Sequence, residues 1–123
     1  RLGLADRVKL LGALPHDQVP RHLAAADVMA LASASEGLAN AWVEALASGT
    51  PVVITDAGGA REAVNRPAAG RIVDATPTAF SEAIAALIAD PPTADDVKEA
   101  AARFSWEANT TALYDHLRSL AKP

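Results

Sequence analysis

Residues 33–64, SASEGLANAWVEALASGTPVVITDAGGAREAV, predict a loop, a helix, a buried strand and a Gly-Gly turn that leads into another helix. The first helix is expected to begin at about Asn40, and Ser48-Gly49 is expected to end it. Pro51 opens the strand, and the apolar run Val52–Ile54 forms its centre. Strands that alternate with helices across short loops are typical of a parallel α/β sheet, so this stretch sets the predicted fold class.

The segments on either side continue the alternation of strands and helices. Val8–Leu11 is a short strand candidate, and a helix is expected to open at Pro15–Asp17. Val28–Ala32 is nearly all apolar, which is typical of a parallel strand buried on both faces. Ile72-Val73 is the last predicted strand. The sequence therefore predicts an α/β fold in which a parallel sheet is flanked by helices.

The last part of the chain, residues 77–123, is predicted to be helical. Pro91-Pro92 interrupts the helical pattern, and Thr93 and Ser105 are expected to cap the two helices that follow. The final helix carries an apolar stripe at helical spacing. Trp106 near its start is expected to anchor this helix by packing, and the stripe is expected to pack against the other domain of a whole enzyme.

Length and composition limit the classes of function. The 123 residues amount to 12.7 kDa, so residues 1–123 are predicted to form a single domain. A formal net charge of −4 provides no basic surface, which argues against nucleic acid as a partner. The chain has no cysteine and its three histidines are scattered, so no metal site is expected. The lack of cysteine, and of any apolar run near the roughly 20 residues that span a bilayer, fits a cytoplasmic location.

Two glutamates, Glu36 and Glu44, lie eight residues apart around the start of the predicted helix. Glu36 belongs to the preceding loop, and Glu44 lies about one turn inside the helix. Backbone N–H groups at a helix start have no intrahelical partner and carry partial positive charge, so they can hold a phosphate. Carboxylates can accept hydrogen bonds from sugar hydroxyls. The pattern therefore indicates a site for a molecule that carries both phosphate and sugar.

The expected place of these residues in the fold supports a ligand site. In an open parallel sheet, ligands bind outside the carboxyl ends of the strands. The loop after Ala32, which contains Glu36, and the loop after Thr55, which contains Gly58-Gly59, are both expected at that edge. This placement follows from the predicted topology and is independent of any family resemblance.

The same stretch resembles the signature of the retaining glycosyltransferases of family 4, which have the GT-B architecture. The resemblance rests on Glu36-Gly37, Glu44-Ala45 and the run Ala47–Val53. Weaker matches flank it at Val8–Gly12, Leu14-Pro15, Ala25–Val28, Gly58-Gly59, Glu62, Ala69-Gly70 and Phe104–Trp106. Ala39 departs from the pattern, because many members have proline there. The resemblance covers nearly the whole chain and implies a Rossmann-like nucleotide-sugar-binding domain, the C-terminal half of a GT-B glycosyltransferase, without its first strand-helix units.

The resemblance also implies a role for individual residues. Glu36 would be the catalytic carboxylate and would contact donor sugar hydroxyls close to the reacting carbon. Glu44 would bind the ribose, and Leu14 would present backbone groups to the nucleobase. The implied donor-binding residues are Leu14, Glu36, Gly37, Leu38, Ala39, Asn40 and Glu44, with Gly58 and Gly59 as further loop contacts.

The function implied by the resemblance is transfer of a hexose-type sugar from a nucleotide-sugar donor to an acceptor hydroxyl, with retention at the anomeric carbon and without a metal or other cofactor. Because the chain begins at Arg1 rather than methionine, we expect it to be a piece of a longer protein. The family's basic pair for the diphosphate and its acceptor-binding N-terminal domain would then lie upstream. Any contact with a membrane surface would belong to that part, and the chain alone is expected to be inactive.

Two alternatives use the same fold. The first is a binding or scaffold module with a degraded site, for which Ala39 is the one hint, whereas the intact Glu36 and Glu44 argue against it. The second is another GT-B-like enzyme, such as a nucleotide-sugar epimerase or a phosphorylase, although a phosphorylase would need a cofactor lysine that we cannot place here. A basic pair and a second Rossmann-like half upstream of Arg1 would favour the transferase.

Overall fold

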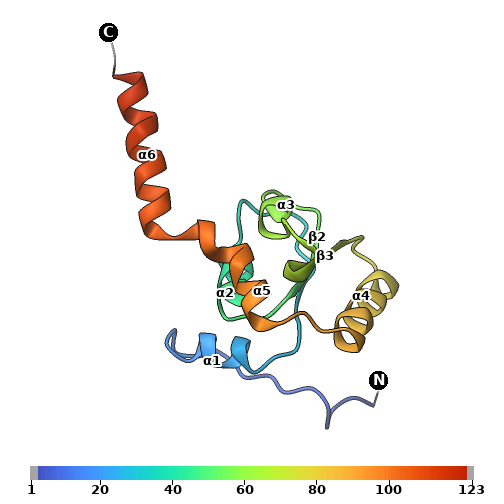
Figure 1. Ribbon diagram of the computed structural model, residues 1–123. Helices are drawn as coiled ribbons and strands as arrows, with labels where there is room; N and C mark the ends of the chain where they lie inside the picture. Colours follow the sequence, from blue (N-terminus) through green and yellow to red (C-terminus); the bar gives the residue numbers. More distant parts are fainter. Residues whose placement is uncertain (1–2, 122–123) are drawn as a thin grey trace.

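The computed structural model describes residues 3–121, which form a three-stranded parallel sheet with helices on both faces (Figure 1). The strands lie side by side in the order β1 (Met29–Leu31), β2 (Val52–Thr55) and β3 (Gly70–Val73). The register pairs Val52 of β2 with the first residue of each neighbouring strand, so the carboxyl ends of all three strands share one edge. This arrangement confirms the predicted α/β fold with a parallel sheet.

Helices cover the sheet from two sides in the described part of the chain. Figure 1 shows α2 and α5 on one face of the sheet and α4 on the other. The α-helices are α1 (Val19–Ala24), α2 (Asn40–Ala47), α3 (Ala60–Ala63), α4 (Pro77–Ala89), α5 (Ala94–Ala101) and α6 (Trp106–Leu120), and the 3-10 helices are η1 (Pro67–Ala69) and η2 (Ala102–Phe104).

Alternate side chains of β2 enter two cores, one on each face of the sheet. The core against α2 and α5 has fully buried residues from all three elements: Val52, Ile54, Trp42, Ala45, Leu46, Val97 and Ala100. On the other face, Val53 packs with Ala83 and Leu87 of α4. Full burial of a valine, leucine or isoleucine side chain contributes about 1.5–3 kcal/mol, so the central strand is strongly held on both sides.

Helix starts match the capping residues predicted from the sequence. The Thr93 hydroxyl accepts a hydrogen bond from the backbone N–H of Asp96 at 3.2 Å, which caps α5. The Ser105 hydroxyl accepts one from the N–H of Ala108 at 3.1 Å, which caps α6. Such caps satisfy backbone donors that have no partner inside the helix. Both predicted caps are therefore confirmed, and α2 likewise begins at the predicted residue.

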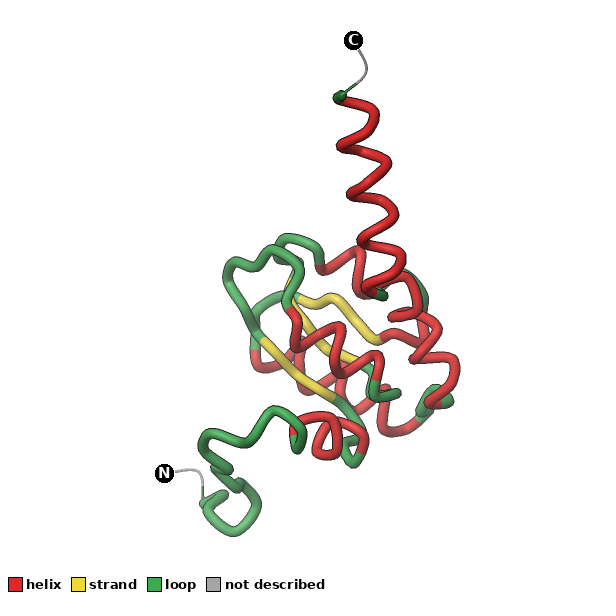
Figure 2. The backbone as a smooth tube through the Cα atoms, turned by 90° about the vertical axis from the view of Figure 1, so that its left-hand side faces the viewer, coloured by secondary structure: helices red, strands yellow, loops and turns green. Residues whose placement is uncertain are grey.

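The strand predicted at Val8–Leu11 is wrong. This segment is irregular and exposed, with Leu10 95% exposed. A strand needs a hydrogen-bonded neighbour, and the described sheet ends at β1, whose pairing partner is β2. Figure 2 shows the segment running away from the strands.

Two other predictions change at the β1 side of the sheet. The strand expected over Val28–Ala32 is shorter, and it is partly exposed rather than buried on both faces. The reason is its position, because an edge strand has sheet on one side only. The helix expected to open at Pro15–Asp17 begins later, at Val19, after a turn, and Pro20 lies in its first turn.

The helix α6 extends away from the rest of the domain (Figures 1 and 2). Its apolar residues Leu113, Leu117 and Leu120 are more than half exposed. Trp106 is 86% exposed, so the prediction that it anchors the helix by packing is wrong for this chain. Within residues 3–121, no helix combines the length and the apolar character needed to cross a membrane.

Candidate functional site

The loops that follow β1 and β2 meet at the carboxyl edge of the sheet, as the topology predicts. The Thr55 hydroxyl donates to the carbonyl oxygen of Ser33 at 2.5 Å. The backbone N–H of Gly59 donates to the carbonyl oxygen of Gly37, also at 2.5 Å. These bonds join the loop that carries Glu36, which is partly buried, to the Gly58-Gly59 turn.

Gly58 is what allows this close approach of the two loops. Its φ is +51°, and an added Cβ would lie 1.9 Å from the carbonyl oxygen of Glu36 and 2.4 Å from that of Gly37. A side chain at this position would therefore clash with the backbone of the neighbouring loop, in addition to the strain of a left-handed conformation. The turn thus packs directly against the backbone of the Glu36 loop.

The start of α2 lies directly after the Glu36 loop and has backbone donors without a side-chain cap. Ala39 occupies the N-cap position with φ −68° and ψ 124°, and its methyl group cannot accept a hydrogen bond. The usual capping residues place an oxygen there. The N–H of Trp42 donates to the carbonyl oxygen of Ala39 at 3.1 Å, so the N–H groups of Asn40 and Ala41 are the ones that keep their capacity to bind an anion, and the helix dipole favours negative charge at this end.

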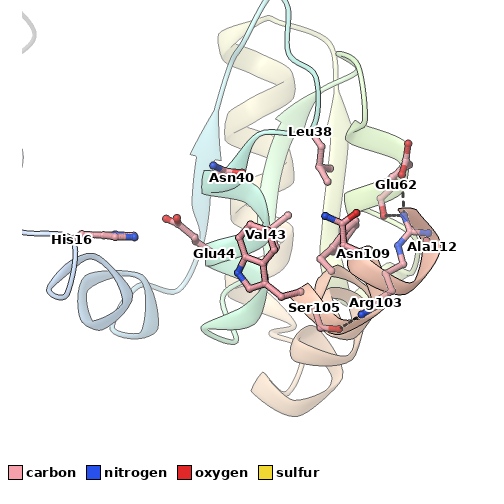
Figure 3. Close-up of a pocket in the computed structure, with 13 residues that line it drawn as sticks. His16, Leu38, Asn40, Val43, Glu44, Glu62, Arg103, Ser105, Asn109 and Ala112 are labelled. Atoms are coloured by element: carbon pink, nitrogen blue, oxygen red, sulfur yellow. Dashed lines mark hydrogen bonds and ion pairs between the residues drawn. The ribbon is translucent and has the colours of Figure 1, made fainter. Parts of the chain in front are cut away.

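The exposed face of α2 lines an open groove of about 810 Å³ (Figure 3). Asn40 and Glu44 are one helical turn apart and both belong to this face, with Glu44 partly buried. The groove is lined by residues from four regions of the chain, namely His16, Leu38, Asn40, Val43, Glu44, Glu62, Arg103, Phe104, Ser105, Trp106, Ala108, Asn109 and Ala112. It is large enough for a ligand of nucleotide size.

At one end of the groove, Glu44 faces a residue that the sequence analysis did not single out. Figure 3 shows the His16 ring, which comes from the turn before α1, and the Glu44 carboxylate, which comes from α2, pointing toward each other. At the other end, Arg103 contacts Glu62, with its Nη2 3.5 Å from the Glu62 carboxylate. The groove therefore has an acidic residue at each end, and each faces a basic residue.

A second ion pair lies beside the Gly58-Gly59 turn. Arg61 of α3 makes two hydrogen bonds to the carboxylate of Asp56, with donor–acceptor distances of 3.2 and 2.6 Å. Hydrogen bonding to Asp56, together with the charge of its carboxylate, raises the pKa of Arg61 above its ordinary value. Both side chains are largely exposed, so this pair contributes little to stability.

The structure divides the predicted site residues into two neighbouring groups. Leu38, Asn40 and Glu44 line the groove. Glu36 and Gly37 belong to the loop that meets Gly58 and Gly59 at the sheet edge. Ala39 packs partly against the core, and Leu14 is partly buried two residues before His16. Their roles toward a ligand stay predictions.

Several groove residues were missed by sequence reasoning. The sequence gives His16 no site role, and it marks Glu62 only as a weak match to the family pattern. Arg103 and Asn109 come from the end of the chain, and no local pattern connects them to residues 38–44. The one available signal was Phe104–Trp106, which had been matched to the family without a role.

Comparison with known proteins places the chain in a family. Residues 1–104 of the 123 match the family profile described as glycosyl transferases group 1. The chain belongs to this family. Family membership confirms the resemblance drawn from the two glutamates and the Gly-Thr-Pro-Val-Val run.

Curated relatives are similar to this family member over nearly its whole length. The D-inositol 3-phosphate glycosyltransferase of Corynebacterium urealyticum is 36% identical over 124 residues, which cover 97% of this chain and 29% of the relative. The GDP-mannose-dependent alpha-(1-6)-phosphatidylinositol monomannoside mannosyltransferase of Mycobacterium tuberculosis is 33% identical over 129 residues. The match covers 94% of this chain and 34% of the relative. The chain therefore spans about a third of the length of these relatives.

A solved structure agrees with the family assignment. The sucrose-phosphate synthase from Thermosynechococcus elongatus superimposes with a TM-score of 0.78 at 32% sequence identity. The match covers 96% of this chain and 32% of the synthase chain. This similarity confirms the predicted GT-B type of fold for this glycosyltransferase chain.

Proposed function

We propose that this chain is the donor nucleotide-sugar-binding domain of a retaining glycosyltransferase that transfers a hexose-type sugar to an acceptor hydroxyl. The observation that carries the proposal is the arrangement around the start of α2. Glu36 lies before the uncapped helix start, in a loop at the carboxyl edge of a parallel sheet, and Glu44 lies one turn inside the helix on its groove face. Membership of the glycosyltransferase family supports the same reaction class.

Each part of the site suits one part of a nucleoside diphosphate sugar. The free N–H groups at the start of α2 are suited to the diphosphate, whose charge grows as the sugar leaves. Glu44, partly buried on the groove face, is suited to accept hydrogen bonds from the ribose diol. Glu36 is suited to the sugar hydroxyls near the anomeric carbon. The bond from that carbon to the diphosphate oxygen breaks, a bond to the acceptor oxygen forms on the same face, and the acceptor's hydroxyl proton passes to the departing diphosphate.

The remaining parts of the proposed enzyme lie outside this chain. The relatives are about three times as long, which leaves room for an acceptor-binding N-terminal domain and for the basic pair that meets the diphosphate. We propose that transfer needs both, so residues 1–123 alone would not catalyse it. The reaction would need no metal or other cofactor, and the enzyme would act in the cytoplasm.

Binding of nucleotide sugars to the full-length protein tests the proposal. Calorimetry with UDP-, GDP- and ADP-linked hexoses, each beside its free nucleoside diphosphate, is expected to identify at least one donor that binds. With that donor and a matching acceptor, proton NMR of the first product is expected to report the donor's own anomeric configuration. If no nucleotide sugar binds, the chain keeps the fold without the activity and the scaffold alternative stands. An inverted product would contradict the retaining mechanism.

A further inference from the structure

Arg103, in the short helix η2, holds the far end of α3 by two contacts to one residue. Its Nη2 donates to the backbone carbonyl oxygen of Glu62 at 2.8 Å and lies 3.5 Å from the Glu62 carboxylate (Figure 3). The guanidinium makes a cation–π contact with the ring of Phe104, whose centroid is 4.7 Å from Arg103 Cζ. An ion pair this exposed contributes little stability on its own, so the hydrogen bond to the carbonyl oxygen is the stronger of the two contacts.

The helix α3 connects that contact to the Glu36 loop within a few residues. The N–H of Glu62 donates to the carbonyl oxygen of Gly59 at 2.9 Å, in the first turn of α3. The N–H of the same Gly59 donates to the carbonyl oxygen of Gly37 at 2.5 Å. Gly37 is bonded directly to Glu36 in the chain. Three hydrogen bonds and the backbone between them therefore connect Arg103 to Gly37, the residue after Glu36.

We propose that Arg103 is a positioning residue for Glu36, acting through α3 and the Gly58-Gly59 turn. The role of Glu36 toward the sugar rests on the function proposed above, but the mechanical link to its loop does not. The helix α3 has only four residues and few internal hydrogen bonds; Ala60 and Ala63 are buried in the core, whereas its Glu62 side faces Arg103. Loss of the Arg103 contact would let α3 shift, and the turn under the Glu36 loop would shift with it.

Arg66 provides a matched control for Arg103. It is also an arginine close to α3, its side chain is 40% exposed against 50% for Arg103, and it also makes an ion pair, to Glu99 of α5 at 2.5 Å. Arg66 reaches Glu62 only indirectly, because its Nε donates to Asn65 Oδ1 at 3.4 Å and the Asn65 amide donates to the Glu62 carbonyl oxygen, also at a long 3.4 Å. Arg66→Gln should therefore cost a comparable, small amount of stability without loosening the Glu36 loop.

Hydrogen exchange on the full-length protein tests the link itself. In Arg103→Gln, amides of residues 33–40 and Gly59 are expected to exchange about three- to tenfold faster, while β2 exchanges as in wild type. Arg66→Gln is expected to leave the loop unchanged. Equal loop exchange in wild type and Arg103→Gln would overturn the proposal, as would equal acceleration in both variants. If Arg103→Gln does not fold, Arg103→Lys, which keeps the charge but loses the planar fork, is judged by the same criterion.

Calorimetry separates this proposal from the proposed function. The sugar increment is defined as the Kd of the free nucleoside diphosphate divided by the Kd of its sugar conjugate. Arg103→Gln is expected to lower the sugar increment about three- to tenfold, whereas Arg66→Gln leaves the sugar increment unchanged. An unchanged increment in a protein that binds the donor would overturn the effect on Glu36. If wild type binds no donor, the proposed function fails, and the exchange rates still decide whether Arg103 holds the loop.

Discussion

The backbone N–H of Gly59 donates to the carbonyl oxygen of Gly37 at 2.5 Å, so the turn after β2 is bonded directly to the loop after β1. Glu36 precedes Gly37, and its position is therefore set by two neighbouring strands rather than by its own loop alone. Such convergence at the carboxyl edge of a parallel sheet is what makes that edge suitable for ligands.

Gly58→Ala is expected to destabilise the protein by at least about 1–2 kcal/mol, the cost of a left-handed conformation for a residue with a side chain. The added Cβ would also meet the carbonyl oxygen of Glu36, so the loop must move. Urea denaturation measures the loss of stability, and calorimetry with the bound donor is expected to show a lower sugar increment.

Gly37→Ala is the control for stability at this junction. An added Cβ on Gly37 has no atom of the described structure within 4 Å. The substitution is therefore expected to change the free energy of unfolding by less than about 0.5 kcal/mol. Equal losses in Gly37→Ala and Gly58→Ala would contradict the account of the close approach.

Thr50→Val is expected to destabilise the domain by about 1 kcal/mol, the net contribution of one hydrogen bond. Thr50 is buried, and its hydroxyl donates to the carbonyl oxygen of Leu23 at 2.5 Å, which ties α1 to the turn before β2. Thermal unfolding compares it with Thr111→Val, on the exposed surface of α6, which should change little. Equal melting temperatures for wild type and Thr50→Val would show that this bond does not matter.

Much of the fold could be predicted because the deciding signals are local. The fully buried β2 appears as an apolar run opened by Pro51, and hydroxyl residues at Thr93 and Ser105 mark the helices that they cap. The two loops that carry Glu36 and the Gly58-Gly59 turn follow consecutive parallel strands, so their meeting at one edge also followed from topology.

The errors arise where a segment depends on contacts that its own residues do not determine. Val8–Leu11 has the composition of a strand but lies beside none of the strands in residues 3–121. Trp106 has the composition of a core residue but no surface of this domain covers it. Arg103 was missed because its partner Glu62 is 41 residues away, and only the folded chain brings them together.

The exposed stripe of α6 is expected to make the isolated chain self-associate. Leu113 and Leu117 are 55% and 56% exposed on one face of the helix, and exposed apolar patches promote association. Light scattering of residues 1–123 is expected to show mass that rises with concentration. The double variant Leu113→Glu/Leu117→Glu should scatter as a monomer, whereas Thr111→Glu, on the opposite face, should behave like wild type. A monomeric wild-type chain at all concentrations would disprove this prediction.

We propose that Glu36 binds the sugar of the donor and that Glu44 binds its nucleotide. Calorimetry of the full-length protein tests this assignment, with one bound donor and its free nucleoside diphosphate, in Glu36→Gln, Glu44→Gln and the control Glu82→Gln, which alters an exposed residue of α4. Glu44→Gln is expected to weaken both ligands by about tenfold or more, as for loss of a hydrogen bond to a charged group. Glu36→Gln is expected to weaken the sugar conjugate alone, and Glu82→Gln neither. If Glu36→Gln weakens the free nucleotide as much as the conjugate, or Glu44→Gln weakens neither, the assignment of the two carboxylates is wrong.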